Sequence, residues 1–181
     1  MRREVAGLVV RELKMKQNEA AIKDFNKAIT LAPQVDTGYF NRGTAYNGLN
    51  RPGDAHKDFD RAISINPKNS EALRGRGDAH LSMKDPGRAV KDYSDAIDVN
   101  PANDFYYFQR GKAYQQLGKP QNALQDFNQA ISINGIAKYY LARGFLYNKM
   151  NKAVLANADV KRAQVLDPRL PRKIRFEQGQ S

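Results

Sequence analysis

The sequence contains no cysteine and no tryptophan, only two histidines, and no long apolar run. Without cysteine the chain cannot form a disulfide, a thiolate metal site or a cysteine nucleophile, and its redox compartment stays open. The apolar stretch near the N-terminus, Leu8-Val9-Val10, is far too short to span a membrane. Arg11 and Lys14 follow where a small-residue cleavage site would be, so no signal peptide is evident. If Met1 is the native start, this predicts a cytoplasmic protein.

Acidic residues are scarce in the C-terminal half of the chain. Residues 105–181 carry 13 Lys or Arg against 4 Asp or Glu, whereas residues 1–104 carry 17 against 15. Most of the net charge of +11 therefore lies in the second half. Such asymmetry indicates an acidic partner for that half, and the alternative is a basic surface that only keeps the protein solvated.

A nine-residue pattern recurs along the chain and dominates its organisation. The segment Ala55 to Ile63 returns as Ala21 to Ile29, Ala89 to Ile97 and Ala123 to Ile131, and more faintly as Ala156 to Gln164. Successive copies begin 34, 34, 34 and 33 residues apart. A fixed period of this length is typical of a repeat protein whose units stack on one another.

Each unit predicts two helices joined by a short turn. Tyr39, Gly43 and Tyr46 are three and four residues apart, as on one face of a helix, and Ala55, Phe59 and Ala62 repeat that spacing. Between them lies Asn50-Arg51-Pro52-Gly53, where proline ends the first helix and suits the first turn of the second. Small residues on both helices allow them to pack closely together.

The order of glycine, tyrosine, alanine, phenylalanine, alanine and closing proline resembles the tetratricopeptide repeat. The resemblance covers residues 36–170, whereas Val9 and Glu12 replace the glycine and tyrosine of the first unit, which looks like a degenerate cap. It implies an all-α, right-handed α-solenoid of about five helix-turn-helix repeats, forming one domain over residues 1–170. We expect repeats at 2–35, 36–69, 70–103, 104–136 and 137–170, then a basic tail, 171–181, that is disordered or forms a short helix near Arg172 to Gln178.

Two charged residues also recur with the repeat. An arginine precedes the glycine of the first helix at Arg42, Arg76, Arg110 and Arg143. An aspartate precedes the large apolar residue of the second helix at Asp24, Asp58, Asp92, Asp126 and Asp159. Their fixed offset predicts partly buried ion pairs, within one repeat or between two. The alternative is an arginine ladder that binds a ligand.

The resemblance also places side chains in a concave groove, because the first helix of each family repeat lines it. The implied set is Phe40, Thr44, Asn47, Arg74, Asp78, Leu81, Phe105, Phe108, Lys112, Gln115, Lys138, Leu141, Phe145, Asn148 and, at the edge, Lys149. Phenylalanines on such a face indicate a contact site if they are exposed. Alternatively, Phe105 and Phe145 pack between neighbouring repeats.

No motif predicts catalysis, a metal or a cofactor. The two histidines, His56 and His80, lie in different repeats, and neither has a nucleophile or ligand at the spacing of a triad or metal site. The resemblance therefore implies a non-enzymatic adaptor or scaffold that binds an acidic peptide or protein with apolar anchors. Two alternatives remain open: binding of nucleic acid by the basic half, and a regulatory subunit that pairs with itself or with a separate enzyme.

Overall fold

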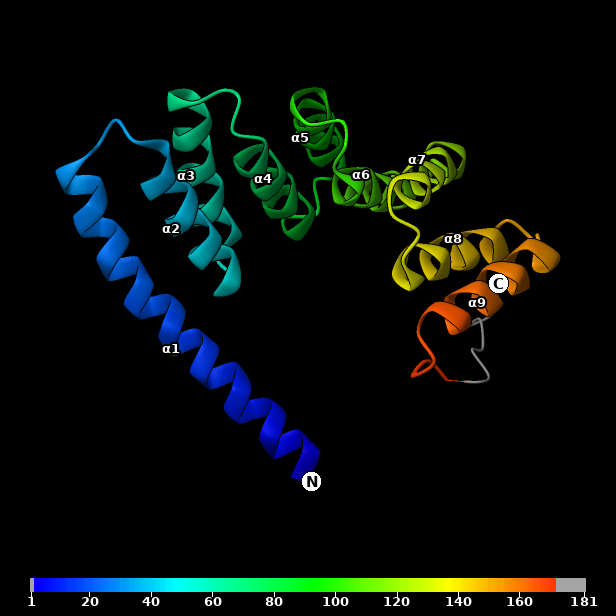
Figure 1. Ribbon diagram of the computed structural model, residues 1–181. Coiled ribbons are helices and arrows are strands. Elements are labelled where there is room, and N and C mark those ends of the chain that lie inside the picture. The colour runs from blue at the N-terminus through cyan, green and yellow to red at the C-terminus, as the bar shows by residue number, and fades with distance from the viewer. Residues whose placement is uncertain (1, 172–181) are drawn as a thin grey trace. The chain divides into compact units, whose positions relative to one another are not determined.

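The computed structural model describes residues 2–171, with the side chains of residues 12–171, and every regular element in that range is an α-helix (Figure 1). The helices are α1 (Arg2–Leu31), α2 (Asp36–Gly48), α3 (Pro52–Ile65), α4 (Ser70–Ser82), α5 (Pro86–Val99), α6 (Asp104–Gln116), α7 (Pro120–Ile133), α8 (Ala137–Lys149) and α9 (Ala153–Leu166). Helices α1–α5 belong to one compact unit, unit 1, and α6–α9 belong to a second, unit 2. The expected all-α repeat fold is confirmed. The tail predicted beyond Pro171 lies outside the described residues.

Helices α2 to α9 form four hairpins, α2–α3, α4–α5, α6–α7 and α8–α9. One turn residue in each adopts a left-handed φ of 57° to 66°: Asn50, Lys84, Gly118 and Asn151. The next N–H then reaches back over the end of the first helix, as where Arg51 donates to the Tyr46 carbonyl at 2.9 Å. Pro52 and Pro120 begin α3 and α7, where their missing N–H leaves no helical hydrogen bond unmade.

Within each hairpin the helices approach closely at the glycine of the first helix. A Cβ added at Gly43 would lie 3.0 Å from the Phe59 ring, and one at Gly111 only 2.7 Å from the Phe127 ring. The alanines on either side of these rings are fully buried at Ala55, Ala62, Ala123 and Ala130. The small residues therefore set the helix separation, and one aromatic ring fills the space that they leave.

Each repeated arginine pairs with the aspartate 16 residues later, across its own hairpin. In the first pair, Nε and Nη2 of Arg42 donate to the two carboxylate oxygens of Asp58, both at 2.7 Å. The other pairs are Arg76–Asp92 at 2.6 Å, Arg110–Asp126 at 2.8 Å and Arg143–Asp159 at 2.7 Å. Only 4% to 8% of each of these four aspartate side chains is exposed, so the arginine replaces the water that burial removes.

The third guanidinium nitrogen of three arginines reaches the helix before the hairpin. Nη1 donates to Asn26 from Arg42 at 2.6 Å, to Asp60 from Arg76 at 2.6 Å, and to Asn128 from Arg143 at 2.7 Å. The sequence left open whether the arginines bind within one repeat or between two, and these arginines do both. The buried carboxylates join the two helices of one hairpin, and Nη1 joins that hairpin to the preceding repeat.

The first repeat is not the helix-turn-helix that its span, 2–35, was expected to form. It contains a single uninterrupted helix, α1, which packs on α2. Lys16, the counterpart of the left-handed turn residues, lies inside α1. Val9 provides a steric reason, since it stands at the glycine position, where the next hairpin leaves only 3.0 Å between a Cβ and the facing ring. A hairpin with the helix separation of the next one has no room for a valine at this position.

The close packing predicts different changes in stability for two glycine substitutions. Gly111→Ala should destabilise the protein by about 1–3 kcal/mol, because the methyl group would overlap the Phe127 ring. Gly53→Ala is the matched control, because a Cβ there would meet nothing within 4 Å, and it should be neutral or stabilise by about 0.5–1 kcal/mol. Urea denaturation measures both changes. Wild-type stability in Gly111→Ala would contradict the packing.

The buried ion pairs predict a pH-dependent loss of stability. Burial raises the pKa of the Asp126 carboxyl, and the hydrogen bonds and charge of Arg110 oppose this rise. Arg110→Met removes the opposition, so the folded-state pKa of Asp126 should rise further above its unfolded value. The free energy of unfolding of the variant should then decrease as the pH rises from about 4 through that raised pKa. At pH 7 it should be about 3 kcal/mol lower than that of the wild type.

The control for this experiment is the exposed pair Arg88–Asp85, whose side chains are 74% and 40% exposed. Arg88→Ala should cost under about 1 kcal/mol, with little change between acid and neutral pH. Urea denaturation at several pH values measures both variants. Equal losses in the two would mean that burial adds nothing to the Arg110–Asp126 pair.

Candidate functional site

The predicted groove residues of unit 1 are engaged in contacts within the protein. The half-buried Phe40 ring lies 6.1 Å from the Phe59 ring, centroid to centroid. Asn47 Nδ2 donates to the Gly75 carbonyl at 3.3 Å, which connects α2 to α4. Arg74 is neutralised on its own helix, because its nitrogens lie 2.9 Å from Glu71 and 2.5 Å from Asp78. This face of unit 1 therefore has little uncompensated charge.

Unit 2 presents a different arrangement at the corresponding helices, α6 and α8. Lys138 Nζ lies 5.4 Å from the centroid of the Phe105 ring and 4.7 Å from that of the Phe108 ring. Lys112 Nζ lies 5.8 Å from the same Phe108 centroid. These four residues, Phe105, Phe108, Lys112 and Lys138, are called the Lys–Phe cluster below. It places two exposed ammonium groups against one aromatic surface.

Phe108 is not the exposed anchor that the sequence suggested. Its residue is only 4% exposed, and its ring packs against Tyr139 at 4.8 Å and Phe127 at 5.7 Å, centroid to centroid. It belongs to the hydrophobic core of unit 2, and the ring of Phe105 lies against it at 6.3 Å. Of the three predicted phenylalanines, Phe105 is half-buried and Phe145 is the most accessible, at 40% exposure. The apolar part of the surface is thus smaller than expected.

The remaining predicted residues of unit 2 lie on the same two helices. Gln115, Leu141 and Asn148 are half-buried, and Lys149 is exposed near the end of α8. No contact assigns them a role, so their part in binding stays a prediction. The structure brings Lys112 and Lys138 to one place from α6 and α8, as the sequence suggested for the groove.

Every carboxylate in the described part of unit 2 already has an internal partner. Asp126 and Asp159 pair with arginines, and Asp167 pairs with Arg169. Asp104 accepts hydrogen bonds from the Tyr139 hydroxyl at 2.7 Å and from Asn134 at 3.2 Å. No ion pair within residues 100–171 neutralises Lys112 or Lys138. The cluster therefore lies in a surface whose positive charge is not balanced from within.

The Asp104 contacts, which hold a side chain beneath the Lys–Phe cluster, were not predicted from the sequence. Burial, with the Asp104 hydrogen bond, raises the pKa of the Tyr139 hydroxyl, which stays protonated and holds the ring against Phe108. The sequence signal is an aspartate followed 30 residues later by an asparagine. It also occurs in unit 1, where Asn66 donates to Asp36 at 3.0 Å. This recurrence predicts the Asp104–Asn134 bond at the corresponding positions.

The histidines form a buried contact in unit 1. His80, 4% exposed, takes the place of the packing tyrosine, and its Nε2 lies 3.6 Å from Asp92. Its Nδ1 is buried without a hydrogen-bond partner, and burial lowers the pKa of the ring, favouring the neutral form. His56 lies against it at 4.8 Å, ring to ring. The contact is one of packing, as its position in the repeat predicts.

A metal site needs several ligating side chains close together, and a membrane span needs a long apolar helix. Among the residues that the structure describes, no three His, Asp or Glu side chains gather as a metal site would require. None of the helices within residues 2–171 has the length and apolar character needed to cross a membrane.

Comparison with solved structures shows what this fold is similar to. MamA from Desulfovibrio magneticus RS-1 is 17% identical with a TM-score of 0.79, over 92% of this chain and 93% of that one. TTC0263, a thermophilic tetratricopeptide repeat protein of Thermus thermophilus, is 20% identical with a TM-score of 0.71, over 93% of each chain. YrrB, described as a repeat protein with an unusual peptide-binding site, is 21% identical with a TM-score of 0.71, over 85% of this chain and 80% of its own.

Sequence comparison identifies the family. No curated protein matches the sequence significantly. Models of the tetratricopeptide repeat match residues 12–35, 40–104 and 105–135, which together make up more than half of the chain. The matched residues contain the glycine and aromatic positions that set the helix separation in three of the four hairpins. The chain therefore belongs to the tetratricopeptide repeat family.

Proposed function

We propose that the protein is a binding scaffold whose unit 2 holds a segment of another protein that combines carboxylates with apolar side chains. Repeats of this family generally serve as non-catalytic scaffolds. The similar protein YrrB is described as having a peptide-binding site, which supports a peptide as the kind of ligand. The contact surface of this proposal is the Lys–Phe cluster on α6 and α8.

The observation that carries the proposal is the pair of uncompensated lysines over an aromatic surface. Lys112 and Lys138 both approach the Phe108 ring, which attracts their ammonium groups and holds two positive charges near one place. A carboxylate that arrives between them meets two positive charges and displaces no internal ion pair. Phe105 and the exposed Phe145 then offer apolar surface for neighbouring side chains of the ligand.

Nucleic acid is the second candidate, because the charge of the C-terminal half is strongly positive. Binding of single strands to such a surface relies on free aromatic faces on which bases stack. Here Phe108 is buried in the core of unit 2, and Lys138 approaches the rings of both Phe105 and Phe108. The aromatic part of the cluster is thus poorly suited to stacking, and we favour a protein segment.

A charge reversal tests the site. We expect Lys112→Glu with Lys138→Glu to slow the association of a fluorescent peptide of alternating Glu and Leu by about tenfold or more at low salt. The difference should shrink towards about 0.5 M salt, where the screening length falls to roughly 4 Å. Stopped-flow fluorescence measures the rates. A Lys–Leu peptide and a single-stranded RNA serve as competing ligands.

The matched control carries the same change of charge elsewhere on unit 2. Lys119 and Lys152 are exposed residues at the starts of α7 and α9, so Lys119→Glu with Lys152→Glu alters net charge without altering the cluster. It should slow association much less than the cluster variant. Equal slowing would mean that only net charge matters, and tighter binding of the RNA than of the acidic peptide would favour the second candidate.

A further inference from the structure

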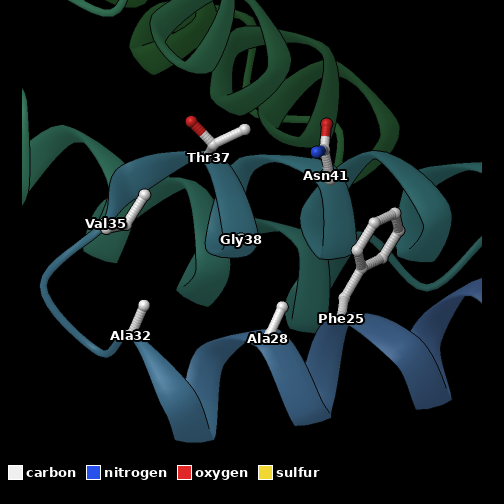
Figure 2. A pocket seen from close by; sticks show the side chains of 7 residues that line it. All are labelled: Phe25, Ala28, Ala32, Val35, Thr37, Gly38 and Asn41. Atoms are coloured by element: carbon white, nitrogen blue, oxygen red, sulfur yellow. The ribbon is translucent and has the colours of Figure 1, made fainter.

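An apolar groove lies between α1 and α2 at the N-terminal edge of unit 1, with a volume of about 260 Å³. We call it the N-terminal groove, and it is lined by Phe25, Ala28, Ala32, Val35, Thr37, Gly38 and Asn41. Figure 2 shows Phe25, Ala28 and Ala32 pointing from α1 toward the helix that carries Gly38 and Asn41. Ala28 and Ala32 are exposed, although their helix packs on α2.

The next repeat reveals what normally covers such a surface. The residues 34 positions after Phe25, Ala28, Gly38 and Asn41 are all buried: Phe59, Ala62, Ala72 and Gly75. Helix α2 covers them, since its Phe40 packs on Phe59 and its Asn47 donates to the Gly75 carbonyl. The N-terminal groove is therefore the seat of a first helix that the first repeat lacks.

The chain itself contains the corresponding helix. Residues 2–14, called the N-terminal segment, stand 34 positions before α2 and are helical. Val5, Leu8 and Val9 have the spacing of one apolar helical face, and the side chain of Leu13 is 55% exposed. The segment continues α1 in a straight line, so position 9 is about 22 Å along the axis from position 24. It cannot cover its own groove while α1 is unbroken.

We propose that the N-terminal segment of a second copy of this chain occupies the groove, and that the exchange is reciprocal. Two copies related by a two-fold axis then each supply the first helix of the partner's first repeat, which is a domain-swapped dimer. The N-terminal groove is continuous with the interface between α1 and α2. The partner's N-terminal segment would therefore extend the packing of these two helices.

Sterics favour exchange over a hairpin within one chain. A closed turn would fix position 9 at the helix separation seen at Gly43, where an added Cβ would lie 3.0 Å from the facing ring. Valine carries two methyl groups beyond its Cβ, so it does not fit at that separation. A helix from another copy is not tied by the turn, so it can sit farther out.

Charge is complementary as well. Asp24 occupies the position of the four arginine-paired aspartates, yet its side chain is 77% exposed and its ion pair with Lys27 is a weak one, at 3.8 Å. The segment has Leu8 at the arginine position, but Arg11 follows one helical turn later. A segment seated in the groove brings this arginine close to the Asp24 carboxylate.

The absence of cysteine allows a direct test with introduced cysteines. In the last hairpin, a Cβ at Gly144 would lie 3.3 Å from Asp159 Cβ, and the corresponding positions are Val9 and Asp24. A helix seated slightly farther out enters the range of about 3.5–4.5 Å that a disulfide needs. We therefore mix full-length Val9→Cys with full-length Asp24→Cys, tagged differently, and oxidise them. A disulfide between the two chains, doubling the mass of 20.4 kDa, is expected.

The control replaces Asp24→Cys by Lys23→Cys, which is also exposed but points to another side of α1, and should give little of the mixed product. The double variant Val9→Cys with Asp24→Cys distinguishes exchange from a hairpin in solution. A disulfide within one chain overturns the proposal, and so does the absence of any mixed product above the control.

Light scattering provides a second test that needs no crosslink. The wild type should have the mass of a dimer. Val9→Gly with Lys16→Gly and Asn18→Pro recreates the glycine and the Gly118-Lys119-Pro120 turn of the third hairpin, so it should close the first repeat within one chain and give a monomer. A monomeric wild type, or a variant that remains a dimer, overturns the proposal. Neither result alters the test of the Lys–Phe cluster, which lies in unit 2.

Discussion

The distance between the two helices of a hairpin is the constraint on which the other contacts depend. In three of the four hairpins it is set where a ring of the second helix meets a glycine of the first, and in the fourth Gly144 faces Asp159 and Val160. Because the helices are so close, the aspartate that precedes this ring, or that precedes Val160 in the fourth hairpin, is removed from water in every hairpin. A buried carboxylate without a partner is costly, and the arginine 16 residues earlier supplies two of its hydrogen bonds. Close packing and ion pairing are therefore one arrangement.

The same arginine also connects one repeat to the next. Its Nε and Nη2 are used within the hairpin, and Nη1 projects toward the preceding helix, where Asn26, Asp60 or Asn128 accepts. A lysine could not replace it, because one ammonium group cannot hold a carboxylate through two parallel bonds and reach a third acceptor in a fixed direction. Stacking in this chain is thus partly directional, and it adds to the apolar contacts between repeats.

Sequence periodicity predicted the helices and the ion pairs because both repeat with the period. What it could not predict depends on departures from that period. Phe105 and Phe108 share a face by spacing, but Phe108 is buried because its ring packs against Phe127 and against Tyr139, which is held by its bond to Asp104. The sequence shows that Val9 replaces the glycine of the repeat. It does not show how little space that glycine leaves, so the continuous α1 and its open groove could not be predicted.

Unit 1 and unit 2 have the same hairpin backbone but differ in what their first helices carry. In α4 the charges at these positions are Arg74 and Asp78, which neutralise each other on one helix. In α6 Lys112 takes the position of Asp78, α8 adds Lys138, and the carboxylates within residues 100–171 are committed to other bonds. Within residues 100–171 the repeated arginines Arg110 and Arg143 are matched by buried aspartates, whereas Lys112 and Lys138 are in no ion pair. This difference in charge between the first helices is why the proposed binding surface is the Lys–Phe cluster of unit 2 and not the corresponding face of unit 1.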